Sequence, residues 1–203
     1  MKSYPIIPKQ VEKISAYAFA KLDGSNIRAE WSKKKGFWKF GSRKRLLGPD
    51  QGTIFKAEAL IKEQEDAYAR IARENRWERC IFFFEFLGPN SFAGFHDEND
   101  AHEVVLLDAN PLRHGIIEPK EFVKKFESVK TAELLHHGSI DSTFVDQVKN
   151  GTLPGMPLEG VVCKAKNPRD SKLPIMFKIK SEAWLQRLKD FCKGDEKLFD
   201  ELS

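Results

Sequence analysis

Four short segments, far apart in the chain, carry side chains suited to chemistry at a phosphate group. They cover residues 21–24, 84–88, 158–164 and 177–180. In the first segment, Lys21 offers an amine nucleophile next to the Asp23 carboxylate and a turn at Gly24. The later segments add two carboxylates, Glu85 and Glu159, and a pair of lysines. Together these groups can attack a phosphate and neutralise its charge.

The lysine pair is a candidate for activating the nucleophile. A lysine in water is protonated at neutral pH and cannot attack phosphorus, so Lys21 needs a lowered pKa. Lys178 and Lys180 can supply the neighbouring positive charge, because residues two apart in a strand point to one face. The alternative is an exposed strand edge whose lysines protect against aggregation.

Three other polar residues in these segments have ambiguous roles. Glu85 lies among phenylalanines, where an unpaired carboxylate is costly, so its partner is either a ligand or an arginine in a buried ion pair. Asp23 is either a functional carboxylate or a residue that stabilises its own turn. Strict strand alternation places Glu159 and Lys164 on opposite faces, which weakens the case for a shared site.

The order of the four segments resembles that of the covalent nucleotidyltransferase superfamily, which comprises ATP-dependent RNA and DNA ligases and mRNA capping enzymes. The resemblance extends over residues 18–181 and includes the run Glu85-Phe86-Leu87-Gly88-Pro89. Asn26 stands five positions after Lys21, where DNA ligases and capping enzymes usually carry arginine. RNA ligases of the RNA ligase 2-like branch usually carry asparagine there, so the chain resembles that branch most.

The resemblance implies a reaction. Lys21 would attack the α-phosphorus of ATP and hold AMP as a phosphoramidate, with Lys178 and Lys180 as the other catalytic residues. AMP would then pass to an RNA 5′-phosphate, and an RNA 3′-hydroxyl would displace it to seal the strand. Glu159 would bind Mg²⁺ or Mn²⁺, because oxygen ligands beside a nucleotide suit these metals. The implied nucleotide contacts are Asp23, Asn26, Arg43, Glu85, Leu107 and Lys164.

Three of these contacts have more specific roles in the resembling family. Glu85 would bind the ribose hydroxyls, and Arg43 would lie near the nucleotide phosphate or the RNA 5′-phosphate. Leu107 is a departure, because the family commonly has an aromatic residue there that stacks on the adenine. Stacking of a base on an aromatic ring contributes about 1–3 kcal/mol, so nucleotide affinity and base choice are expected to differ here.

Hydrophobic patterning predicts an α+β fold of antiparallel sheets with flanking helices. The resemblance implies that this fold is a nucleotidyltransferase (adenylation) domain. Residues 15–19 and 26–31 are expected to form a strand pair joined by the Asp23-Gly24 turn, which 37–42 extends. The other predicted strands are 80–87, 103–108, 158–164 and 175–180. The predicted helices are 55–75, 119–126, 142–149 and 182–191.

The length of 203 residues favours one compact domain, residues 1–203. Only 23 residues follow Lys180, which suits a short helical tail and no appended nucleic-acid-binding domain. The resembling ligases append a further domain, so a separate subunit is a candidate partner.

The charge balance permits a partner rich in phosphate without requiring one. The net charge is +4, and a basic stretch with interleaved aromatics extends over residues 33–45, as expected for RNA contact or for a solvated hairpin. The three cysteines form no disulfide or metal pattern, and the histidines are assigned to the surface or to packing. Without an apolar signal or membrane segment, the protein is expected to be soluble and cytoplasmic.

Two other functions remain open at this point. A DNA nick ligase or a capping-type guanylyltransferase would use the same lysine chemistry, although Asn26 disfavours both. A nucleotide- or RNA-binding module without catalysis is supported by Leu107 and by the short segment after Lys180.

Overall fold

The strands form two antiparallel four-stranded sheets that face each other. This computed structural model describes residues 1–43, 54–89, 99 and 101–203. The first sheet has the order β6-β1-β7-β8 and the second β3-β2-β4-β5. The strands of the first sheet are β1 (Ser15–Ala20), β6 (Leu134–Ser139), β7 (Gly160–Ala165) and β8 (Ile175–Lys180). Those of the second sheet are β2 (Ser25–Ser32), β3 (Gly36–Ser42), β4 (Arg79–Leu87) and β5 (Glu103–Pro111).

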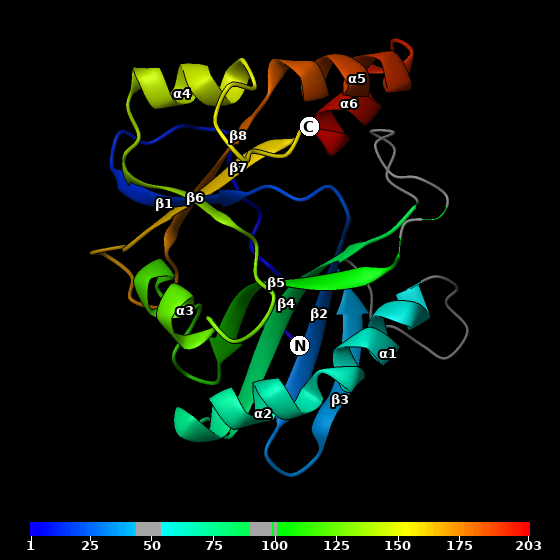
Figure 1. Cartoon of the computed structure of the whole chain (residues 1–203), viewed down its shortest axis with the longest axis vertical. Coiled ribbons are helices and arrows are strands. Elements are labelled where there is room, and N and C mark those ends of the chain that lie inside the picture. The colour runs from blue at the N-terminus through cyan, green and yellow to red at the C-terminus, as the bar shows by residue number, and fades with distance from the viewer. Residues whose placement is uncertain (44–53, 90–98, 100) are drawn as a thin grey trace.

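Helices cover the outer faces of both sheets (Figure 1). Side chains of α1 (Ile54–Glu63), α2 (Glu65–Glu74) and α3 (Pro119–Lys125) join the core of the second sheet. The helix α4 (Ser142–Lys149) packs on the first sheet through Phe144 and Val148. Two last helices, α5 (Glu182–Cys192) and α6 (Glu196–Leu202), follow β8 and pack against each other.

Alternation of side chains along β4 explains why one face of the second sheet is apolar and the other carries a carboxylate. Phe82, Phe84 and Phe86 point into the core that α1 and α2 cover. Phe83 and Glu85 point to the opposite face, toward the first sheet. The run of phenylalanines therefore stabilises the sheet on one side and leaves a carboxylate on the other.

An apolar cluster holds the inner faces of the two sheets together. Met176 of β8 packs with Phe83 of β4, and the N-terminal segment adds Tyr4 to the same cluster. The ring centroids of Tyr4 and Phe83 are 4.9 Å apart. The polar residues described below lie between the sheets beside this cluster.

The expected α+β fold with antiparallel sheets is confirmed, but one predicted pairing is wrong. β1 pairs with β6 and β7, and β2 pairs with β3 and β4, so the two strands belong to different sheets. The link between them is tied to both sheets, since Lys21 N–H donates to Gly160 O (3.0 Å) and Gly24 N–H donates to Glu85 (3.2 Å). It is therefore a crossover and not a hairpin turn.

The helix expected over 55–75 is two helices in the structure. At Gln64 the backbone hydrogen bonds shift to a spacing of three residues, from Gln64 N–H to Ile61 O and from Ala67 N–H to Gln64 O. Hydrophobic periodicity continues across this break and so did not reveal it. The strand β6 was not predicted, because its two histidines and glycine give no alternating apolar pattern.

Candidate active site

Lys21 lies where the chain passes from the first sheet to the second. It continues the alternation of β1, in which Tyr17 and Phe19 share the inner face of the first sheet with Lys164 and Val162 of β7. Its side chain is 21% exposed, so the amine is reachable from solvent. The backbone bond to Gly160 fixes Lys21 beside the start of β7.

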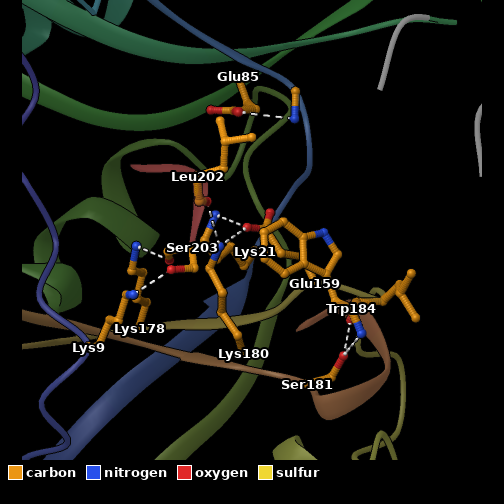
Figure 2. Close-up of polar contacts among 12 residues, drawn as sticks. Lys9, Lys21, Glu85, Glu159, Lys178, Lys180, Ser181, Trp184, Leu202 and Ser203 are labelled. Carbon is orange, nitrogen blue, oxygen red and sulfur yellow. Dashed lines mark hydrogen bonds and ion pairs between the residues drawn. The ribbon is translucent and has the colours of Figure 1, made fainter. Parts of the chain in front are cut away.

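Glu159 binds two of the predicted lysines. Its Oε1 lies 2.7 Å from Lys21 Nζ and 3.0 Å from Lys180 Nζ, although Glu159 is only 5% exposed (Figure 2). The next residue, Gly160, has φ +126°, and an added Cβ would lie 2.2 Å from Ile179 O. Only glycine can make this turn, so it orients Glu159 toward the lysines.

The same turn corrects the expectation that Glu159 and Lys164 lie on opposite faces. Glu159 precedes β7, whose alternation begins only at Gly160. Within the strand pair, Gly160 faces Lys180 and Lys164 faces Met176, so both lysines lie on the inner face. Alternation failed because a glycine with positive φ separates the carboxylate from the strand.

Lys178 and Lys180 share the inner face of β8, as predicted. Burial, together with the positive charge of Lys21, lowers the pKa of each ammonium group to about 8. Lys9 further lowers the pKa of Lys178, whereas Glu159 raises both values. Lys180 Nζ also lies 3.5 Å from the centre of the Trp184 ring, a cation–π contact.

Glu85 and Asn26 form the opposite wall, on the second sheet. They are directly paired across β2 and β4 and so project from the same face. Burial raises the pKa of Glu85 to about 7, and the charge of Lys21 partly offsets that shift. Gly24 approaches so closely that an added Cβ would lie 2.5 Å from Phe86 O. Glu85 accepts a hydrogen bond from the Gly24 amide. Among the described residues it forms no ion pair with an arginine, which was the alternative to a ligand.

Lys164 is buried and has protein partners. Its Nζ donates to Asp108 Oδ2 (2.7 Å) and to Leu107 O (2.8 Å), and the Tyr4 hydroxyl also donates to Asp108. The Lys164 side chain is 4% exposed and that of Asp108 is 1% exposed. This ion pair connects β7 of the first sheet to β5 of the second. The predicted nucleotide contact of Lys164 stays a prediction.

Leu107 is the extra residue of a β-bulge. Phe83 pairs with Asp108 and Phe84 pairs with Leu106, so Leu107 has no partner on β4. Its half-buried side chain packs between the core of the second sheet and the cluster between the sheets. The bulge also points Asp108 inward, toward Lys164.

The remaining predicted residues lie around this site. Asp23 is half-buried in the crossover, and Arg43 is exposed at the end of β3. Arg43 is close enough to lower the pKa of Glu85 and of Lys178 through its charge. The predicted roles of both residues stay predictions.

The described basic residues of the stretch 33–45 are spread from one end of β3 to the other. Lys33, Lys34 and Lys35 are exposed in the turn between β2 and β3, which lies at the end of the second sheet far from β7 and β8 (Figure 1). Arg43 lies at the other end of β3. Lys44 and Arg45 are outside the described residues.

Sequence reasoning missed residues that come from the two ends of the chain. Lys9 Nζ donates to Ser203 Oγ (2.6 Å), Lys178 Nζ donates to Ser203 O (2.8 Å) and Lys180 Nζ donates to Leu202 O (3.4 Å). No motif or periodicity marks these segments, because only the tertiary fold brings them to the site. The role of Asp108 in pairing with Lys164 was missed for the same reason.

A divalent metal fits Glu159 only if other ligands complete its coordination. In the described part of the chain, no group of three or more His, Cys, Asp or Glu side chains is arranged to hold a metal. Magnesium commonly uses one or two carboxylates together with substrate phosphates and water. Glu159 can therefore hold a metal together with a nucleotide, once its carboxylate is released from the lysines.

Comparison with known proteins agrees with this arrangement. A family model described as RNA ligase matches residues 16–180. No protein among those with curated descriptions matches the chain. Within the described residues, no helix is both long enough and apolar enough to cross a membrane.

Solved structures of RNA ligases share the fold. The chain is similar to a Naegleria gruberi RNA ligase with PPi, at TM-score 0.61 and 16% identity over 87% of this chain and 52% of that chain. A variant of the Naegleria gruberi ligase with ATP and Mn has a TM-score of 0.61 and 14% identity over 92% of this chain and 60% of that chain. An archaeal ATP-dependent RNA ligase has a TM-score of 0.66 and 15% identity over 95% of this chain and 52% of that chain. The chain thus spans about half the length of these proteins.

Proposed function

Because the chain belongs to the RNA ligase family, we propose that it is the adenylyl-transferring catalytic core of an ATP-dependent RNA ligase. Lys21 Nζ forms a bond to the α-phosphorus of ATP as the bond to pyrophosphate breaks. The resulting lysyl-AMP then gives its adenylyl group to an RNA 5′-phosphate and regenerates the free lysine. Attack by an RNA 3′-hydroxyl forms the new phosphodiester and releases AMP.

The observation that carries this proposal is the convergence of Lys21, Lys178, Lys180 and Glu159 between the two sheets (Figure 2). An accessible amine beside two further ammonium groups suits attack on a polyphosphate, because the cations offset the charge of the substrate. Attack requires the neutral amine. Glu159 Oε1 lies 2.7 Å from Lys21 Nζ and orients the amine, and because the Lys21 side chain is 21% exposed its proton can leave to solvent.

The two sheets bind different parts of the nucleotide. Lys178 and Lys180 bind phosphate oxygens, while Glu85 and Asn26, from the opposite sheet, bind the nucleoside. A carboxyl group with a pKa near 7 can donate as well as accept a hydrogen bond, which suits a ribose hydroxyl. Asp23 stabilises the crossover that carries Lys21, and Leu107 and Lys164 lie at the base side of the nucleotide.

A divalent metal, Mg²⁺ or Mn²⁺, would be held by Glu159 together with phosphate oxygens and would neutralise charge on the polyphosphate. The Naegleria gruberi structures with ATP and Mn support this choice of nucleotide and metal. A Glu159 carboxylate bound to the metal would leave Lys180 available to bind phosphate. Glu159 would then have exchanged its two lysine partners for the metal.

The proposed acceptor is RNA with a 5′-phosphate and a 3′-hydroxyl, which the family assignment supports. Arg43 is exposed beside the site and is placed to bind the RNA 5′-phosphate. We include in the proposal that residues 1–203 act as a single catalytic core. Since the similar ligases are about twice as long, contacts to the rest of the RNA would come from a separate subunit or segment.

The test is formation of a covalent AMP adduct. The protein is incubated with α-labelled ATP and magnesium, and the product is analysed by denaturing electrophoresis and intact mass. The wild-type chain is expected to gain one AMP, whereas Lys21→Ala and Lys21→Arg gain none; Lys21→Arg keeps the positive charge next to Glu159. An adduct on either variant contradicts the assignment of Lys21, and labelling by GTP instead of ATP indicates a capping-type enzyme.

A further inference from the structure

The N-terminal segment brings another lysine to the phosphate side of the site. Lys178 N–H donates to Pro8 O (2.9 Å), so this segment runs along the free edge of β8. Lys9 is thereby held beside Lys178, close enough for its charge to lower the pKa of Lys178. Lys9 lies outside residues 16–180, the part that the family model matches.

Both ammonium groups contact the same residue. Lys9 Nζ donates to Ser203 Oγ (2.6 Å) and Lys178 Nζ donates to Ser203 O (2.8 Å), and Ser203 is only 4% exposed. Figure 2 shows Lys9 and Lys178 converging on Ser203 from one side. A set of oxygen atoms thus lies between two cations, which is the arrangement that a phosphate group would provide.

Near this residue the lysine side chains outnumber their carboxylate side-chain partners. Glu159 is shared by Lys21 and Lys180. Neither Lys9 nor Lys178 forms an ion pair with an Asp or Glu side chain within the described ranges of the chain. Two neighbouring lysines that are not paired with an Asp or Glu side chain can bind a multivalent anion, because its charge offsets their mutual repulsion.

The segment that carries Ser203 is held mainly by apolar packing. Leu198 and Phe199 of α6 pack against Trp184, Leu188 and Cys192 of α5. Lys9, by contrast, is positioned by the backbone bond to β8 and does not depend on α6. Displacement of Ser203 would therefore leave both ammonium groups in place.

We propose that Lys9 and Lys178 form an anion subsite for the polyphosphate of the nucleotide, which Ser203 occupies in this arrangement and leaves when polyphosphate binds. The subsite deepens the proposed function and rests on it for the identity of the ligand. Lys9 is then a substrate-binding residue outside the family motifs. The segment with Ser203 competes with substrate.

The first experiment measures binding of inorganic tripolyphosphate by calorimetry. Lys9→Ala is expected to weaken binding about tenfold, the loss of one charge-assisted hydrogen bond. Lys13→Ala, which removes an exposed lysine of the same segment, serves as the control and should bind as the wild-type chain does. Absence of binding to the wild-type chain, or equal affinity of Lys9→Ala, overturns the proposal.

The second experiment tests the competition. Leu198→Ala/Phe199→Ala weakens the packing of α6 without changing any charge, and it is expected to bind tripolyphosphate at least about threefold more tightly, because less free energy is spent on displacing Ser203. Leu112→Ala, at an exposed apolar residue after β5, is the matched control. Unchanged or weaker affinity of the double variant overturns the displacement.

The two readouts separate this inference from the proposed ligase activity. If the wild-type chain forms no AMP adduct but tripolyphosphate binding still depends on Lys9, the anion subsite stands and the ligase assignment fails. If the adduct forms and Lys9→Ala leaves both tripolyphosphate affinity and the KM for ATP unchanged, the ligase assignment stands and the subsite is wrong.

Discussion

Two lysine–carboxylate pairs lie between the sheets, with the same separation and very different surroundings. Lys21 and Glu159 are 2.7 Å apart, as are Lys164 and Asp108. The Lys21 side chain is 21% exposed, whereas that of Lys164 is 4% exposed. Glu159 binds a second lysine, Lys180, and Asp108 binds the Tyr4 hydroxyl instead.

In the proposed function, the exposure of the lysine, more than the residue types, separates a reactive pair from a structural one. Because the Lys21 side chain is reachable from solvent, the Lys21–Glu159 pair can exchange its internal partners for a substrate or a metal. The buried Lys164–Asp108 pair cannot be separated without leaving a charge in an apolar environment. Burial raises the pKa of both Asp108 and Tyr4, and Lys164 and their mutual hydrogen bond offset that cost for Asp108. We therefore assign the first pair to chemistry and the second to joining the sheets.

The largest expected effect is the loss of stability caused by breaking the buried Lys164–Asp108 pair. Lys164→Met leaves Asp108 buried with only Tyr4 as partner, and it is expected to lower the free energy of unfolding by about 3–5 kcal/mol. Urea unfolding measures this change. Lys166→Met is the control, because Lys166 is 74% exposed and its ion pair with Glu118 is worth about 0–1 kcal/mol.

The double variant Lys164→Met/Asp108→Asn sharpens the interpretation. It removes the unpaired charge and is expected to recover part of the lost stability, since the cost comes from the buried carboxylate. A double variant no more stable than Lys164→Met would contradict a coupled ion pair.

A substitution in the Lys21–Glu159 pair is expected to change the metal dependence of the reaction more than the stability of the fold. Glu159→Gln keeps the shape of the side chain but removes its charge, so adduct formation should require about tenfold more magnesium. A magnesium titration of the AMP adduct measures the shift. Glu182→Gln, at an exposed carboxylate in the first turn of α5, should leave the titration unchanged. An unshifted curve for Glu159→Gln would rule out its role as a metal ligand.

Nucleotide affinity should fall above pH 8. The pKa values of Lys178 and Lys180 are lowered to about 8, so both groups are charged at pH 7 and lose their charge as pH rises through 8. The KM for ATP is expected to rise several-fold between pH 7 and pH 9.5. Lys178→Arg keeps its charge over this range and should reduce the slope, leaving the part due to Lys180. A slope equal to that of the wild-type chain would show that Lys178 does not bind the nucleotide.

Glu85 should produce the smallest effect, a pH dependence of stability. Its pKa is raised in the folded state to about 7 from an ordinary value of 4.5, so the folded protein binds more protons than the unfolded chain between these values. This contribution to stability is present below pH 4.5 and is lost as pH rises through 7. Urea midpoints at pH 5 and pH 7.5 should therefore differ less in Glu85→Gln than in the wild-type chain. Identical pH dependence in both would contradict a raised pKa.

Local sequence patterns determined most of the elements and the polar residues of the Lys21–Glu159 pair. The alternation of Lys178 and Lys180 follows directly from their spacing in β8, and the run of phenylalanines around Glu85 indicated a strand with a carboxylate that needs a partner. These inferences succeeded because they depend on the period of a strand, which neighbouring residues set. The resemblance to the RNA ligase family rested on the same segments and is confirmed by the family match.

Only the tertiary structure decided which strands share a sheet and which residues reach the site from a distance. The crossover after β1 separates strands that looked like a hairpin, and the positive φ of Gly160 turns Glu159 to the face of Lys164. Lys9 and Ser203 are 194 positions apart yet form a hydrogen bond. No local pattern can reveal such a contact, because it depends on the packing of whole sheets and helices and not on the sequence next to either residue.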